Sequence, residues 1–406
     1  MLKYNFKYEL INLIRSRWLL MLVLVLLGVF IFAGINGKQK VDGRLKSINA
    51  AKTEMENGDK TMVKLLDSIE NGFQVTSVPY WRTPDQPMAA GNNHPRVAAM
   101  EPNPLTFTAV GQSDLYTHYV KPTVSGDDFA LNFTELASPV QLLFGSFDLA
   151  FVIVFLLPLI IIAFSYNVLS AEKENGSIKL LASEPVSVYM WLMQKLLLRF
   201  FWLGLILVFS ILVVFLMNGV AIAENLSKIA VFLLLTLAYA LFWFAIAFVV
   251  NLSAGSSAKN AIALLGLWVL LVLVTPAVIN QLANSLYPVP SRATMINEMR
   301  NVKADATKKQ DAILDAYLRD HPEYAQQDTT KYTFWHSYMA SQKLIKDELA
   351  PVLNSYESQI KKQQQVVKNF RFASPAIIVQ ENLSKLAGTS TENYESFRQQ
   401  VSNFAG

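Results

Sequence analysis

The chain has 406 residues, of which 52% are hydrophobic and 16% are charged. Soluble domains carry about 25% charged residues, so this composition favours a membrane protein. The net charge of +4 is too small and too scattered to indicate a nucleic-acid partner, and the absence of cysteine excludes disulfides and cysteine chemistry.

The N-terminal residues predict an amphipathic helix followed by a membrane anchor. Residues 1–17 predict a helix at the membrane interface, with an ordinary cytoplasmic tail as the alternative. Residues 18–35 predict the first transmembrane span, with Arg15 and Arg17 before it. The sequence Phe32–Asn36 is a poor cleavage site, which favours a retained anchor over a signal peptide. The apolar residues that recur at helical spacing are Leu2, Phe6, Leu10, Leu13 and Ile14.

A polar insertion separates the first span from the rest. Residues 36–141 predict an extracytoplasmic region with a helical portion near residues 62–69 and a proline-rich stretch at 79–104. Residues 142–283 then predict spans two to five, with a cytoplasmic coupling segment at 171–195 after span two. The four predicted spans cover residues 145–170, 196–217, 229–250 and 261–282, and the later joins, 218–228 and 251–260, are short.

Basic residues near the span ends predict the orientation. A cytoplasmic N-terminus places Lys173, Lys195, Arg199 and Lys259 inside, whereas the short external join carries only Lys228. Basic residues just after the first span fall outside, but long translocated regions often escape this rule. We therefore expect a multi-pass protein of the bacterial cytoplasmic (inner) membrane with large extracytoplasmic loops.

The remaining residues, 284–406, predict a helical extracytoplasmic region. Residues 293–318 and 333–370 have the length and the Lys, Glu, Gln and Ala content of long helices, with Pro351 interrupting the second. They predict a helical hairpin standing on the membrane, which either binds cargo or a partner or acts as a spacer. A sixth apolar run is absent from this region.

Residues 171–187 are patterned in a way that predicts contact with a soluble partner. An acidic-basic-acidic start and an Asn-Gly-Ser break precede a leucine pair and a proline, which predicts a turn and a short amphipathic helix along the membrane face. The alternative is a loop whose charges are merely solvated. The residues of this pattern are Glu172, Lys173, Glu174, Gly176, Ser177, Leu180, Leu181 and Pro185.

This pattern resembles the segment after the second span of ABC-2 type transporter permeases. The order of an interfacial helix, one span, a long insertion and four more spans is similar too, and it resembles a subgroup with two large extracytoplasmic insertions. Such permeases usually have six spans, so we expect that the given sequence is truncated before a last span. The resemblance implies an all-α polytopic bundle with a mainly helical extracytoplasmic domain.

The resemblance also implies partners. A separate dimer of ABC ATPase subunits would bind ATP and Mg and push on the coupling segment, with Glu172, Glu174 and Gly176 in the turn that it contacts. The chain has no phosphate-binding Gly-x-x-x-x-Gly-Lys-[Ser/Thr] motif, so we expect no cofactor on this chain and no ATPase activity of its own. We expect a second permease, identical or paralogous, and an exporter of unidentified substrate. The alternative is a mechanotransmitting subunit that acts on an extracytoplasmic partner or lipid, and a membrane-embedded enzyme comes third.

Three residues of the spans are candidates for gating or for lining a path. Pro158 and Pro276 each remove a backbone hydrogen bond and bend a helix, although prolines also occur in membrane helices for packing. Asp148 is costly if it faces lipid, so it would line an exit path or reach the interface. The four histidines lie far apart and form no ligand spacing, so we expect no metal site.

Overall fold

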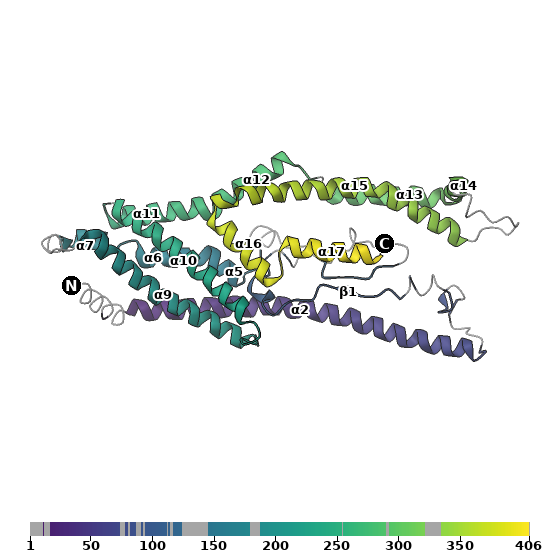
Figure 1. Cartoon of the computed structure of the whole chain (residues 1–406), viewed down its shortest axis with the longest axis horizontal. Coiled ribbons are helices and arrows are strands. Elements are labelled where there is room, and N and C mark those ends of the chain that lie inside the picture. Colours follow the sequence, from purple (N-terminus) through teal and green to yellow (C-terminus); the bar gives the residue numbers. More distant parts are fainter. Residues whose placement is uncertain are drawn as a thin grey trace.

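The computed structural model of the chain consists of long helices that run roughly along one axis (Figure 1). Among the described residues the only sheet is one antiparallel ladder between β1 (Ala98–Ala99) and β2 (Tyr119–Val120). The all-α class predicted from the sequence is thereby confirmed. The structure describes residues 11, 17–73, 78–79, 82–86, 91, 94–111, 113, 117–123, 145–178, 187–253, 255–289, 292–320 and 334–405.

Helix α2 (Arg17–Glu70) carries the first span and continues far beyond it. Its 54 residues rise about 80 Å, whereas the hydrocarbon core of a bilayer is about 30 Å thick. The second half stays helical because it contains good helix formers and no proline, and an ion pair of 2.9 Å joins Lys38 to Asp42 one turn later. The first third of the predicted insertion is therefore a direct extension of the span. The predicted interfacial helix at residues 1–17 lies almost entirely outside the described residues.

Five helical segments of the described residues are long and apolar enough to cross a membrane, and they coincide with the five predicted spans. The second and fifth are each interrupted by a π-helical stretch, at Val152–Leu156 and Val269–Val274. The elements of spans two to five are α5 (Leu149–Phe151), α6 (Leu157–Ser165) and α7 (Ser170–Glu174), then α9 (Val188–Met217), α10 (Leu226–Ser253), α11 (Ser257–Trp268) and α12 (Thr275–Leu286).

One hydrophobic core joins these spans. Phe30 of α2, Phe215 of α9 and Trp243 of α10 are fully buried in it, and the rings of Phe215 and Phe232 meet edge to face at 5.5 Å. The opposite faces of the same helices expose large apolar side chains, among them Phe201. Such faces suit a lipid environment, because burial inside a bilayer replaces burial inside the protein.

After span five the chain forms the predicted hairpin outside the spans. It consists of α13 (Arg292–Lys308), α14 (Gln310–Asp320) and α15 (Phe334–Phe370), and α15 packs against α12, α13 and α14. The expected interruption at Pro351 is wrong, because α15 passes through it. Pro351 cannot donate a hydrogen bond to the carbonyl of Asp347, four residues earlier. Because Asp347 is exposed, water can supply that hydrogen bond instead.

Helix α16 (Pro375–Ala387) turns back towards the spans and packs into their core. At its C-terminal end, the Thr106 hydroxyl donates to the Ala387 carbonyl at 2.9 Å, and the Asn103 amide donates to the Leu386 carbonyl at 3.2 Å. These two side chains come from the first insertion, so the two extramembrane regions meet at this helix end. The α16 residues in the shared core are Ala376, Val379, Leu383 and Ala387.

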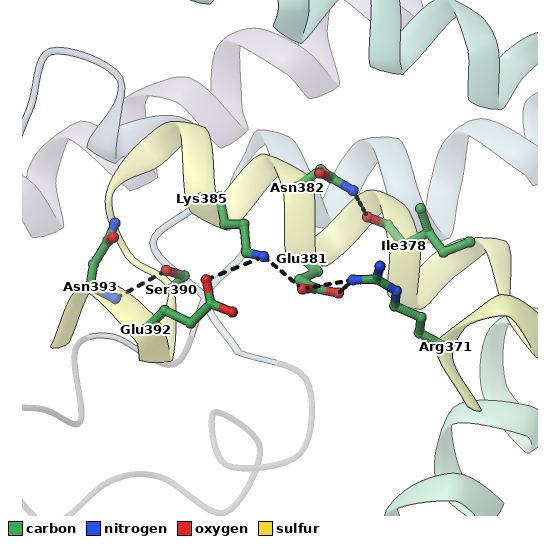
Figure 2. Close-up of polar contacts among 8 residues, drawn as sticks. All are labelled: Arg371, Ile378, Glu381, Asn382, Lys385, Ser390, Glu392 and Asn393. Atoms are coloured by element: carbon green, nitrogen blue, oxygen red, sulfur yellow. Dashed lines mark hydrogen bonds and ion pairs between the residues drawn. The ribbon is translucent and has the colours of Figure 1, made fainter. Parts of the chain in front are cut away.

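A chain of ion pairs follows the outer face of α16 (Figure 2). Glu381 lies 3.3 Å from Arg371 and 2.9 Å from Lys385, and Lys385 lies 3.2 Å from Glu392. Arg371 belongs to the 3₁₀ turn that ends the hairpin, and Glu392 belongs to α17 (Thr391–Ala405). The pairs therefore connect the hairpin, α16 and α17 into one unit.

Candidate functional site

The predicted coupling segment begins at a break in the second span. Helix α6 ends at Ser165 and α7 begins at Ser170. In a continuous helix the Leu169 N–H would donate to the Ser165 carbonyl. Here it donates to Oδ1 of Asn251 at 3.3 Å, while Nδ2 of Asn251 donates to the Ser165 carbonyl at 2.9 Å. The side chain of a residue on α10 is thus inserted into the backbone ladder of span two, which is a recognised cause of helix bending.

A second buried amide lies beside the first. Nδ2 of Asn260, on α11, donates to the Tyr166 carbonyl at 2.9 Å and lies 3.3 Å from Oδ1 of Asn251. It also lies 3.4 Å from the Ser170 hydroxyl, which is 2.9 Å from the Ser257 hydroxyl. We call Ser170, Asn251, Ser257 and Asn260 the amide cluster. Ser170, Asn251 and Asn260 are at most 1% exposed and are shielded from water, whereas Ser257 is partly exposed.

Glu174, the last residue of α7, binds the start of α11. Its carboxylate accepts a hydrogen bond from the Ser257 N–H at 2.7 Å and another from the Ser257 hydroxyl at 2.9 Å. The first N–H groups of a helix have no partner within the helix, and the helix dipole favours a negative charge there. Glu174 therefore caps α11 and fixes the end of α7 to the start of span five.

A third contact fixes α7 to span three. Glu172 forms an ion pair of 3.0 Å with Lys195 on α9, and the Lys195 ammonium lies 4.2 Å from the centre of the Trp191 ring. Both charged side chains are mostly buried, so this pair is less screened than one on the surface. Helix α7 is thus bonded to spans three and five, and Leu169, the residue before it, is bonded to span four.

The turn after α7 is formed by Asn175, Gly176 and Ser177. Gly176 has φ +76°, a conformation that side chains disfavour, and a Cβ atom there would meet nothing within 4 Å. Asn175 and Gly176 are exposed, and the described residues leave open space beside Gly176. Of the remaining predicted residues, Leu180, Leu181 and Pro185 lie outside the described residues.

The prediction that Glu172 and Glu174 belong to this turn is wrong. Both lie on α7 together with Lys173, because the helix continues until the Asn175 N–H donates to the Ala171 carbonyl at 2.9 Å. Only the residues after Glu174 reverse the chain. The carboxylates of Glu172 and Glu174 bind Lys195 and Ser257 on neighbouring spans, which leaves the turn itself uncharged.

Asp148 has a structural role at the opposite end of span two. It is 1% exposed, and its carboxylate accepts N–H groups of Phe151 and Gly111, each at 2.8 Å. It caps the first turn of α5 and fastens the first insertion to it. Both carboxylate oxygens thus accept hydrogen bonds from backbone donors of the chain itself, and the predicted place of Asp148 on an exit path stays a prediction.

Pro158 follows directly on the first π-helical stretch and frees carbonyl groups before it. The hydroxyl of Tyr239 on α10 donates to the Val154 carbonyl at 3.0 Å, four residues before the proline. The indole N–H of Trp268 on α11 donates to the next carbonyl, that of Phe155, at 3.2 Å. Neighbouring spans thus supply the hydrogen bonds that the proline removes.

The carbonyl groups before Pro276 likewise accept hydrogen bonds from side chains. The N–H and the hydroxyl of Thr275 both donate to the Leu270 carbonyl across the second π-helical stretch. The Leu271 carbonyl accepts a hydrogen bond of 2.7 Å from the hydroxyl of Ser374, the residue that also caps the start of α16. A bent span is thereby joined to the second extramembrane region. The gating role predicted for both prolines remains a prediction.

Sequence reasoning missed the amide cluster. The sequence pattern places Asn251 and Asn260 in a short join between two spans, where polar residues usually reach water. A signal was nevertheless present, because Asn251 closes an apolar run and Asn260 opens the next one. The Ser165–Ser170 stretch likewise carries three polar side chains before the charged segment begins.

Comparison with known families accounts for nearly the whole chain. The family model of ABC-2 family transporter proteins matches residues 6–405. No curated protein matches the chain. The matched range includes α7, the turn at Gly176 and all five candidate spans. The chain therefore belongs to the ABC-2 family of transporter proteins, and it is a multi-pass permease of that family.

Proposed function

We propose that this chain is the membrane subunit of an ATP-driven exporter, in which a separate ABC ATPase drives the spans by pushing on the segment after α7. The observation that carries this proposal is the position of α7 and its turn. A short polar helix lies at the end of the bundle and is bonded to spans three and five, and Leu169 just before it is bonded to span four. Force applied there would reach most of the bundle.

The distribution of basic residues supports a cytoplasmic position for this end. Lys195 and Arg199 on α9 and Lys259 on α11 lie at the α7 end, whereas residues 218–228, the join after α9 and the first turn of α10, carry Lys228 alone. This is the bias expected of a cytoplasmic face. The N-terminus would then be cytoplasmic in a bacterial inner membrane, and the hairpin and the outer half of α2 extracytoplasmic.

The partners follow from the energetics of the proposal. ATP and Mg would bind to the ATPase subunits, because the chain lacks a phosphate-binding loop. Two ATPase subunits need two coupling segments, so a second permease, identical or paralogous, completes the complex. The apolar outer faces of the spans contact the lipid bilayer.

The proposal is tested by the variant Gly176→Val in the purified complex with its ATPase. Valine at φ +76° costs roughly 1–2 kcal/mol and distorts the turn. We expect the stimulation of ATP hydrolysis by the permease to fall several-fold while membrane insertion is unchanged. Hydrolysis is measured in lipid nanodiscs, with the ATPase subunit alone as the baseline.

Gly219 supplies the matched control. It also has positive φ, at +72°, also meets nothing within 4 Å, and lies in the turn after α9 at the other end of the bundle. Gly219→Val should leave the stimulation intact. Equal losses in the two variants, or a purified complex that contains no ATPase, would count against the proposal.

A mechanotransmitting subunit is the second candidate. Helix α2 and the α13–α15 hairpin both extend well beyond the spans, as a subunit that acts on an extracytoplasmic partner would require (Figure 1). Vesicle assays would separate the two candidates. ATP-dependent movement of a compound across the membrane supports export, whereas a motion of the hairpin without any transported compound supports force transmission.

A further inference from the structure

We infer that α7 and the corner between α10 and α11 (residues 251–260) move as one unit, so that force on α7 enters spans four and five through the amide cluster. This inference rests on the proposed function. It assigns Asn251, Asn260 and Glu174 as positioning residues, and it makes the α10–α11 corner a second part of the coupling machinery.

The backbone connection between α7 and the rest of its own span is weak. The ladder of span two is interrupted between Ser165 and Ser170, where the Leu169 N–H is bonded to Asn251 and not to the Ser165 carbonyl. Helices bend most easily where a side chain enters the ladder. A push on α7 is therefore poorly transmitted along α6.

The connection of α7 to the corner is strong. The residues around the break are bonded to the corner by Asn251, Asn260 and the Ser170–Ser257 hydroxyl pair, and Glu174 adds two bonds to Ser257. The corner is short, since α10 ends at Ser253 and α11 begins at Ser257. A displacement of α7 would carry both helix ends with it.

Burial of the two asparagine side chains makes the loss of their hydrogen bonds costly. Both asparagine side chains are at most 1% exposed, so water cannot replace a bond that breaks. A buried polar group without a partner costs roughly 1–3 kcal/mol. Among the described residues, separating α7 and Leu169 from the corner would break five hydrogen bonds, those of Leu169 to Asn251, of Ser170 to Asn260 and Ser257, and of Glu174 to Ser257. Bending at residues 166–169 strains two, those of the Ser165 and Tyr166 carbonyls to the two amides. A push on α7 therefore bends span two at residues 166–169, while α7 and the α10–α11 corner stay bonded to each other.

The test uses the full complex of permease and ATPase in nanodiscs. The chain contains no cysteine, so spin labels can be attached at Asn175→Cys, in the turn after α7, and Ala258→Cys, on the exposed start of α11. Pulsed electron resonance measures the distance between the labels without nucleotide and after trapping with ADP and vanadate. We expect one narrow distance that is the same in both states.

Two variants then break the unit from different sides. Asn251→Leu removes the buried amide, and Glu174→Ala removes the exposed cap without disturbing the core. Loss of one buried hydrogen bond corresponds to about a tenfold change in an equilibrium. We expect a broadened distance already without nucleotide for both variants. Stimulated ATP hydrolysis should fall about tenfold in Asn251→Leu and less in Glu174→Ala, whose bonds to Ser257 are exposed to water.

The matched controls are Ser253→Ala and Glu224→Gln. Ser253 is exposed two residues after Asn251, and its hydroxyl donates to the Val249 carbonyl of its own helix at 2.9 Å. Glu224 is exposed at the other end of the bundle. Both controls should behave like the parent chain. A label distance that changes on nucleotide trapping in the parent chain would overturn the inference.

The outcomes also separate this inference from the proposed function. If the permease stimulates its ATPase, but Glu174→Ala and Asn251→Leu leave both stimulation and distance unchanged, the inference alone is refuted. If no ATPase copurifies or none is stimulated, the proposed function fails and the inference fails with it. A variant that does not insert is recognised by its absence from the membrane fraction, in which case the other variant decides.

Discussion

Gly37 lies where α2 meets the first insertion more closely than any side chain allows. A Cβ atom at this position would be 2.1 Å from the carbonyl oxygen of Phe107, which is backbone and cannot rotate away. The insertion is therefore pressed against the helix just beyond the first span. Asn36 adds a hydrogen bond of 2.7 Å to the Phe147 carbonyl, so adjacent residues of α2 contact both the first insertion and the start of span two.

Gly37→Ala should destabilise the protein by about 1–3 kcal/mol, because the added methyl group must displace backbone. Gly43→Ala on the same helix is the control. A Cβ there meets nothing within 4 Å, and alanine should stabilise the helix by about 0.5–1 kcal/mol. Thermal unfolding in detergent measures both. Similar shifts in the two variants would show that the contact with Phe107 is looser than described.

Tyr239→Phe tests whether Tyr239 replaces the bond that Pro158 removes. The variant leaves the buried Val154 carbonyl without its partner, at a cost of about 1–3 kcal/mol. Pro158→Ala restores an N–H four residues after Val154, so the tyrosine should matter less in the Pro158→Ala background. A double-mutant cycle of unfolding free energies should give a coupling of about 1 kcal/mol. Simple additivity would contradict the assignment.

The ion pairs along α16 control how firmly this helix is attached to its neighbours. Burial acts to raise the pKa of Glu381, but the ammonium of Lys385 and the guanidinium of Arg371 outweigh it, and the net pKa is lowered. The ordinary pKa of such a carboxyl is 4.5, so its pairs stabilise the fold fully above that pH. The stabilisation is lost as the pH falls through the lowered pKa, when the folded carboxylate becomes protonated.

We therefore expect Glu381→Gln to destabilise the protein at pH 7 by at most about 1 kcal/mol, because these side chains are partly solvated. The difference from the parent chain should shrink below pH 4.5 and vanish once Glu381 is protonated. Thermal unfolding from pH 7 to pH 3 gives the measurement. The exposed Glu348 on α15 supplies a control, since Glu348→Gln should show a smaller difference at every pH. A difference that persists at pH 3 would exclude the ion pairs as its cause.

The whole molecule has two distinct ends. The turn after α7 and the corner between α10 and α11 lie at one end, whereas the outer half of α2 and the α13–α15 hairpin extend from the other (Figure 1). This polarity is what the proposed function requires, with the proposed coupling segment at one end and the long helices beyond the spans at the other. The core is continuous from α2 to α16, so the two ends are mechanically connected.

The proposed topology can be tested by labelling single cysteines introduced into the cysteine-free chain. We expect Asn175→Cys to react with an impermeant maleimide only when the cytoplasmic face is open, because the residue lies exposed at the α7 end. Glu224→Cys, in the join after α9, and Lys60→Cys, on the outer half of α2, should react from the outside of intact cells. Labelling of Asn175→Cys from outside would invert the topology and remove the proposed coupling role.

Much of the architecture could be predicted because it depends on local properties. Apolar runs of about 20 residues are long enough to cross a membrane, which located the five candidate spans in chain order. The pattern at residues 171–187 likewise placed a turn at Gly176 and identified the family. The hairpin was predictable too, since residues 293–318 and 333–370 favour helix by composition.

Tertiary contacts decided the roles of individual polar residues. Local sequence describes Asp148, Glu174 and Asn251 only as polar groups near span ends, and each is equally compatible with water, a partner or a path. Their actual partners are Gly111, Ser257 and Ser165, and the last two lie more than 80 residues away along the chain. A buried polar group takes whichever donor or acceptor the packing brings near it, and only the packed helices fix that choice.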